Sequence, residues 1–467
     1  MKTDPDMTRY LCATAYLNCD FRNKVIENLL YERHRAIGLC HGVDLPILVK
    51  HCLAARRRVF FRDMLVVSLF PITLFLTAFI LPEAPRDLSD FGNLIVIWLL
   101  SFSLSFMIVA WETWTRHEIV SEHFLKDNYD PNYSRIKVNA KTTLKLQQIT
   151  EKQNANVVVY SGFSPFVGSG MDMGGWSFSL NVRKGREDLG KRREPQDFEI
   201  GELYSSLVDS MVGLNFEGLI TEDRLFVNGK DIRNDRRFLL TPLSSPESTV
   251  GTDLIDEFKT NPSHAVRHYM CVKITDWKGE LVLSIFLRLA KNGGTFFTEA
   301  NYFLLTPIAE GYRQADSMRP TPGFRATLKL LGVALVKGAL IWFFWWCLLA
   351  FKVGRFFVNW GERTRRERLV AEDPTFDYGA SGTLREYVSS YQYRRYFQKL
   401  DKEMYLKTVE RLILDCVIEF LDEKGVDTSE LRDRQATILN NGVIVTGGAV
   451  RAKTLAVGQN SSASSSG

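Results

Sequence analysis

Two uncharged apolar segments close together dominate the hydrophobic pattern of this 467-residue chain. Residues 64–81 are eighteen residues without a charge, and residues 94–111 repeat the pattern. Such a length is about what a helix needs to cross a ~30 Å hydrocarbon layer. A short polar stretch with Pro82 and Pro85 separates the two segments, so the pattern predicts an antiparallel transmembrane hairpin over residues 63–112.

A third apolar stretch, residues 330–351, is interrupted by Lys337 and Gly338 and contains three tryptophans. Basic residues flank it on both sides, which conflicts with a single crossing under the positive-inside rule. Either the segment crosses the membrane once, with the Lys337 side chain extending to the membrane–water interface, or it forms a re-entrant or in-plane segment. We assign residues 326–358 to this third apolar helix and favour a crossing, because hydropathy usually outweighs flanking charge after a long domain.

Residues 1–62 have helical spacing and predict a small helical segment that caps the hairpin on the cytoplasmic side. Asp44 followed by Pro46 is a typical helix start, and that helix would carry Cys52 directly into the first apolar segment. The apolar positions on one side of the earlier helix are Val25, Ile26, Leu29, Leu30 and Ile37.

Residues 113–325 read as a central α+β domain with an antiparallel meander. Helical patterns cover residues 141–153 and 200–214. Helix and strand do not alternate strictly, which argues against a doubly wound nucleotide fold. The expected strands are residues 157–160, 176–182, 224–227, 269–275, 280–289 and 295–305.

A basic juxtamembrane linker, residues 359–382, precedes C-terminal helices at 383–440. Thr383 and Glu386 have the spacing of a capping box, and a helical run follows with a break expected near Leu400. Gly425 fits the left-handed position that ends such a helix.

Residues 441–467 predict a β-hairpin and a disordered tail. The hairpin sequence VIVTGGAVRAKTLAVG alternates small and apolar residues and resembles one rung of a bactofilin-like β-solenoid, without the repeat. An exposed apolar hairpin of this kind tends to pair with the edge strand of another sheet, so we expect self-association or binding of a protein partner there.

Composition and charge exclude some classes of protein. With 45% hydrophobic and 24% charged residues, the chain is neither a many-pass transporter nor a disordered protein. A net charge of +5 over this length does not indicate nucleic-acid binding. Seven scattered cysteines do not match a disulfide-stapled secreted domain.

Charge also predicts the topology. The start of the first apolar segment carries Arg56, Arg57, Arg58 and Arg62, whereas the loop at 82–93 is acidic. The N-terminus and central domain are therefore expected in the cytoplasm of a multi-pass cell-membrane protein. The N-terminal sequence lacks a cleavable signal peptide pattern, so the first membrane helix is expected to direct targeting.

A glycine-rich run, residues 161–175, follows the strand at 157–160. It does not match a phosphate-binding motif, because the glycine spacing fails and a strand rather than a helix follows. It is either a connection between strands or a binding loop for a small ligand or peptide. The candidate ligand-binding residues are Tyr160, Phe163, Phe166, Gly168, Gly170 and Trp176.

No catalytic residue, cofactor or metal site is predicted. Cys40-His41 and His51-Cys52 fit no zinc spacing and are expected in a helical core. His264 and His268 lie at the start of a strand and are expected on the surface.

Basic residues after the third apolar segment are candidates for contact with anionic lipid headgroups. The leading hypothesis is a membrane-anchored, non-enzymatic sensor or adaptor whose central domain binds a ligand or protein. The alternative is a self-associating effector that perturbs the bilayer through the tryptophan-rich segment, and an enzyme using loop 161–175 is least favoured. The lipid-contact candidates are Lys352, Arg355, Arg363, Arg365, Arg366 and Arg368.

Overall fold

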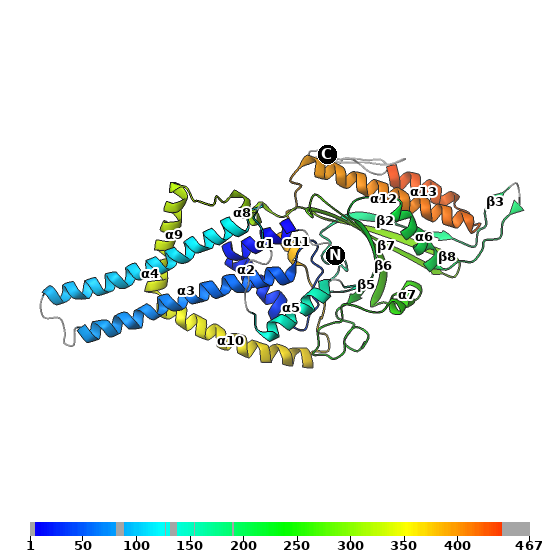
Figure 1. Ribbon diagram of the computed structural model, residues 1–467. Coiled ribbons are helices and arrows are strands. Elements are labelled where there is room, and N and C mark those ends of the chain that lie inside the picture. The colour runs from blue at the N-terminus through cyan, green and yellow to red at the C-terminus, as the bar shows by residue number, and fades with distance from the viewer. Residues whose placement is uncertain are drawn as a thin grey trace, which may run out of the picture.

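The computed structural model is a mixed α+β structure with an elongated shape, a helical hairpin at one end and a curved sheet at the other (Figure 1). The structure describes residues 5–80, 88–126, 128–130, 138–153, 155–188 and 191–440. The predicted C-terminal hairpin and its solenoid-like sequence, at 441–467, lie outside the described residues. So does most of the loop between the first two apolar segments, at 81–87.

The two hairpin helices extend without a break beyond their apolar runs. The prediction that the helix after Asp44 runs through Cys52 into the first apolar segment is confirmed, and Asp44 Oδ1 accepts from the Ile47 amide at 2.9 Å. The N-terminal helices are α1 (Pro5–Leu17), α2 (Cys19–Ile26) and the π-helical turn η1 (Glu27–Tyr31). The hairpin consists of α3 (Leu45–Ile80) and α4 (Leu88–His123).

Three helices of the described chain are long and apolar enough to cross a membrane, at Leu45–Phe79, Phe91–His123 and Phe324–Phe343. The third apolar segment is not one continuous helix, because the chain leaves helical geometry at Phe344, between α9 (Phe324–Phe343) and α10 (Trp345–Glu372). α9 crosses the hairpin and α10 returns alongside α3 (Figure 1). The predicted linker at 359–382 is therefore helical as far as Glu372.

The sheet has six strands in the order β1-β5-β6-β7-β8-β2. The predicted antiparallel meander is confirmed by β5 through β8, and β1 adds in parallel to β5 with Val157 opposite Leu225. After β2, the strands β3 and β4 form a separate antiparallel pair, in which Glu187 lies opposite Arg192. The strands are β1 (Val157–Tyr160), β2 (Met171–Asn181), β3 (Glu187–Asp188), β4 (Lys191–Arg192), β5 (Leu219–Asn228), β6 (Val266–Asp276), β7 (Leu281–Asn292) and β8 (Thr295–Leu305).

One face of the sheet is covered by α6 and α12, and α13 lies against α12 (Figure 1). Leu207 of α6, Leu283 of β7 and Val417 of α12 share one apolar core. The break expected near Leu400 falls a few residues earlier, and Gly425 has the expected left-handed φ of 75°. The remaining helices are α5 (Ala140–Gln153), α6 (Ile200–Val212), α7 (Thr252–Thr260), η2 (Glu310–Tyr312), α8 (Gln314–Ser317), α11 (Leu384–Val388), α12 (Tyr396–Glu423) and α13 (Ser429–Asn440).

A second core joins parts of the chain that are far apart in sequence. Met7 and Leu11 of α1 and Leu48 of α3 are buried with Ile308 and Val388. The start of α3 and the end of α4 are therefore packed against segments that follow the sheet in the sequence.

Candidate functional site

The glycine-rich loop holds a carboxylate of the same chain. Glu386 Oε1 of α11 accepts from the amides of Gly168 and Gly170 at 2.8 and 3.1 Å. Both glycines have φ near +90°, a conformation that brings the two amides to one side. Glu386 Oε2 accepts from the Thr383 amide at 3.0 Å, which completes the predicted capping box. The anion-binding geometry of the loop thus fastens α11 to the sheet.

The predicted ligand-binding side chains lie in different surroundings. Phe166 is buried against the sheet, with its ring 4.3 Å from that of Phe286. Phe163 is fully exposed. Trp176 stacks on Phe178 and packs against the core under α6 and α12, and Tyr160 is half-buried at the end of β1. Ligand binding by these side chains stays a prediction.

A cavity of about 150 Å³ lies beside the loop, between its last residues, the end of β8 and α11. Of the predicted candidates only Gly170 lines it, and Glu386 contributes a carboxylate that is already bound to the loop amides. This small space supplies no pair of converging acid and base groups.

The predicted lipid-contact residues lie on α10. Arg365, Arg366 and Arg368 are exposed, and Arg366 reaches Glu32 of the N-terminal region at 3.6 Å. Lys352, Arg355 and Arg363 belong to the same helix. Their contact with lipid stays a prediction.

The prediction that His268 lies on the surface is wrong. It is 3% exposed, and its Nε2 lies 2.9 Å from Asp223 Oδ1. His268 lies on the face of β6 that α6 covers, and its ring packs edge-on against Tyr204 of that helix. Burial lowers the pKa of His268, although the hydrogen bond to Asp223 acts in the opposite direction. His264 is exposed, as predicted.

Cys12, Cys40 and Cys52 are buried in the N-terminal core, where they pack as small apolar side chains. Within the described ranges, no three His, Cys, Asp or Glu side chains gather with the geometry of a metal site.

Buried cations lie on the sheet face opposite α6 and α12. Arg224 and Lys273 are 5% and 3% exposed, and both contact the carboxylate of Glu222. Burial, reinforced by Arg224, lowers the pKa of Lys273 to about 8. Burial would raise the pKa of Glu222, but the two cations outweigh it and lower that pKa to about 2. Two positive charges and one negative charge are therefore enclosed on this face.

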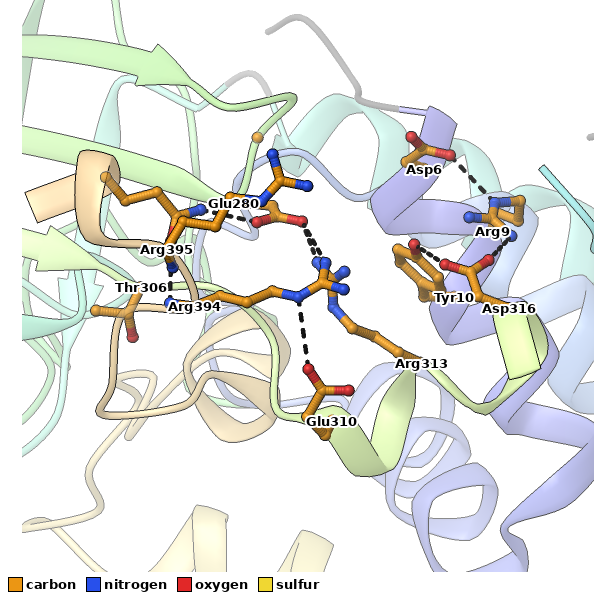
Figure 2. A network of polar contacts seen from close by, with 12 residues as sticks. Asp6, Arg9, Tyr10, Glu280, Thr306, Glu310, Arg313, Asp316, Arg394 and Arg395 are labelled. Atoms are coloured by element: carbon orange, nitrogen blue, oxygen red, sulfur yellow. Dashed lines mark hydrogen bonds and ion pairs between the residues drawn. The ribbon is translucent and has the colours of Figure 1, made fainter. Parts of the chain in front are cut away.

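A polar network lies where the sheet meets the helices, and Figure 2 shows it. Glu280, at the turn between β6 and β7, is bound by the guanidinium of Arg313. The same carboxylate accepts from Gln398 Nε2 at 2.9 Å and lies 3.5 Å from Arg394 Nη1, both at the start of α12. Because Arg313 is only 5% exposed, its charge depends on Glu280 for compensation.

The network continues from Arg313 toward the hairpin of α3 and α4. The guanidinium of Arg313 lies over the Tyr10 ring, 4.8 Å from its centroid, and the Tyr10 hydroxyl donates to Asp316. Burial raises the pKa of Tyr10 to about 12, and the bond to Asp316 acts in the same direction.

Asp316 also accepts from Arg9 Nη1 at 2.7 Å, and Arg9 donates to the Phe124 carbonyl, directly after α4, at 2.7 Å. We call the residues Glu280, Arg313, Tyr10, Asp316 and Arg9 the joint network. It joins the sheet turn and the start of α12 to the base of α4 by direct contacts.

The structure thus has the fold class of a mixed α+β protein with helices long and apolar enough to cross a membrane. The sequence model of the AbeC-like domain matches residues 175–451, which is more than half of the chain. The chain therefore belongs to the AbeC-like domain family. The matched region begins within β2 and includes α9, α10 and the C-terminal helices, whereas the hairpin of α3 and α4 precedes it. No curated protein and no solved structure matches the chain.

Proposed function

We propose that this protein is a membrane-anchored, non-enzymatic sensor or adaptor whose sheet part binds a ligand or protein partner. The observation that supports it is the joint network, which links the sheet turn at Glu280 to the carbonyl of Phe124 at the base of α4. A change in the sheet would then reach the membrane helices through packed polar groups rather than through a flexible linker.

Burial gives this link its strength. Moving the sheet turn away from Arg313 would leave a buried guanidinium without its carboxylate, and breaking a buried pair in this way costs about 3–5 kcal/mol. Arg9 is buried as well, with its side chain 1% exposed, and it has two carboxylate partners, Asp316 at 2.7 Å and Asp6 at 3.1 Å. The two parts should therefore move together, or the network should rearrange as a unit.

Hydrogen exchange of the full-length protein in lipid nanodiscs tests this coupling. Glu280→Gln should speed amide exchange in α1, α8 and the end of α4, as well as at the turn between β6 and β7. The matched control is Glu430→Gln, which removes the exposed partner of Arg434 on α13 and should affect α13 alone. If Glu280→Gln changes exchange only next to its own turn, the coupling is rejected.

We also propose that α9 and α10 form a re-entrant pair rather than a single crossing. Before α9, the Arg319 carbonyl lies 3.3 Å from His117 Nε2 at the base of α4. After α10, Arg233 Nη1 donates to the carbonyls of Val370 and Asp373 at 2.9 and 2.7 Å. Both ends contact the water-facing part, which would put both basic flanks in the cytoplasm and remove the conflict with the positive-inside rule.

Single cysteines test this topology in intact cells, in a background where the accessible Cys19 and Cys347 are replaced by serine. Ser89→Cys, at the tip of the hairpin, should react with an impermeant thiol reagent. Variants at Ser317, before α9, and Glu372, at the end of α10, should react only after permeabilisation, like Ser205→Cys on α6. Labelling of Glu372→Cys in intact cells while Ser317→Cys is protected would mean a true third crossing.

The bilayer-perturbing effector remains the second candidate. Its support is the apolar surface of α9, where Leu331, Val336 and Phe343 are exposed. Against it, Trp342 Nε1 donates to Ser101 Oγ at 3.2 Å and the Trp342 ring packs on Trp98 of α4. The described part of the segment is thus held by the hairpin, and we favour the sensor or adaptor.

A further inference from the structure

A cavity of about 490 Å³ lies at the base of the hairpin, between α2, α3, α4 and α9. Its volume falls within the range of small-molecule sites, about 300–1,000 Å³. Arg62 and Asp63 in its wall directly precede the apolar run of α3, so the cavity lies at the depth where lipid headgroups would meet the protein. None of the residues predicted to contact lipid on α10 belongs to its described lining.

The wall of the cavity carries an excess of positive charge. Its cations are Arg22, Arg56, Arg62, Arg116 and Lys337. Two carboxylates offset them in part: Asp63 and Glu112 lie 2.5 and 3.3 Å from Arg62, and Glu112 lies 3.8 Å from Arg116. Among the described residues, Arg22, Arg56 and Lys337 form no ion pair. The cavity therefore suits an anion.

Arg22 provides an independent indication. Its side chain is 4% exposed, and Nη1 donates to the Ala15 carbonyl at 3.3 Å. Its Nε is buried and has no hydrogen-bond partner in the described chain. Burial lowers the pKa of Arg22, as expected for a guanidinium without a close counter-ion. A buried cation of this kind is costly unless a negative group completes the site.

The cavity also has an apolar part to its lining. Val59 and Phe60 of α3 and Leu340 and Ile341 of α9 contribute it. Phe60 is half exposed, so this apolar surface continues toward the lipid-facing side of the hairpin. A ligand that fills both parts needs a negative head and an apolar body.

We propose that this cavity binds an anionic phospholipid, with its phosphate at Arg22 and Lys337 and its acyl region along Phe60 and Leu340. Guanidinium groups bind phosphate oxygens through paired, charge-assisted hydrogen bonds, and Lys337 adds a point charge from α9. The bound lipid would join α2 to α9, and the position of the tryptophan-rich segment would depend on the anionic lipid content of the membrane.

The test uses the purified full-length protein in neutral detergent, with binding followed by thermophoresis. The probes are dioctanoyl phosphatidylglycerol, dioctanoyl phosphatidylcholine and inorganic phosphate. Wild type should bind phosphatidylglycerol saturably and at least tenfold more tightly than either of the others. Arg22→Met and Lys337→Leu should each weaken that binding at least tenfold. The control, Arg411→Gln, removes an exposed cation of α12 that lies outside the cavity lining, and binding should stay within twofold of wild type.

Melting temperature without lipid separates binding from a structural role. Arg22→Met should melt at the wild-type temperature or higher, because it removes a buried charge that lacks a counter-ion. Lys337 is exposed in the structure, so Lys337→Leu tests the site even if Arg22→Met fails to fold. Equal binding of phosphatidylcholine, equal binding of free phosphate, or unchanged affinity in Lys337→Leu would each overturn the proposal.

Discussion

Phe166→Ala is expected to lower the free energy of unfolding by about 3–5 kcal/mol, the usual loss when a buried phenylalanine is truncated. The ring lies among four other aromatic rings, those of Phe226, Tyr269, Phe286 and Phe303, with centroids 4.3 to 5.2 Å away. Denaturant unfolding of the full-length protein in detergent, followed by near-UV circular dichroism, measures the change.

Phe163 is the matched control because it belongs to the same loop and is fully exposed. Phe163→Ala should change stability by no more than about 0.5 kcal/mol. Equal losses in the two variants would mean that Phe166 does not occupy the aromatic cluster. The pair also separates the structural residue of the loop from the one that is free to contact a partner.

Glu386→Ala is expected to destabilise the protein by about 3 kcal/mol. It removes the acceptor of the Gly168 and Gly170 amides, and each buried donor left without a partner costs about 1–3 kcal/mol. It also removes the capping box of α11, worth about 1 kcal/mol. Glu386→Gln keeps an oxygen for the two amides and should lose less than half as much.

Limited proteolysis of the same variants locates the effect. Cleavage within residues 161–175 should increase in Glu386→Ala and change little in Glu386→Gln. If Glu386→Ala unfolds at the wild-type denaturant concentration, the carboxylate does not hold the loop, and the attachment of α11 must depend on other contacts.

Elements set by local sequence could be predicted. The charge-free runs predicted the hairpin. Alternating apolar and polar residues, bounded by turn residues, predicted the meander. Thr383 and Glu386 gave the cap, because a capping box needs only residues three apart. Glu386 also binds the glycine-rich loop, more than two hundred residues earlier in the sequence. The residues around Glu386 do not predict this second contact.

Features that depend on packing could not be predicted. Phe163 and Phe166 are both apolar residues of one irregular loop, and only the fold decides which ring faces the sheet. The surface position predicted for His268 was wrong because the sequence does not reveal that α6 covers this face of β6. The turn at Phe344 has no proline or glycine beside it, so the apolar run did not show where it would divide into two helices. The joint network pairs Arg9 with Asp316, which are 307 residues apart.

The core that unites Met7, Leu11 and Leu48 with Ile308 and Val388 also fixes the order in which the protein can be completed during synthesis. The ribosome finishes the N-terminal helices early, but Val388 emerges only after more than three hundred further residues. At about 5–20 residues per second, that interval is roughly 15–70 seconds. During it α1 and α2 lack part of their final partners, although α3 and α4 have already been synthesised. The apolar side chains of α1 that this core buries therefore stay partly uncovered until the segment around Val388 has been made.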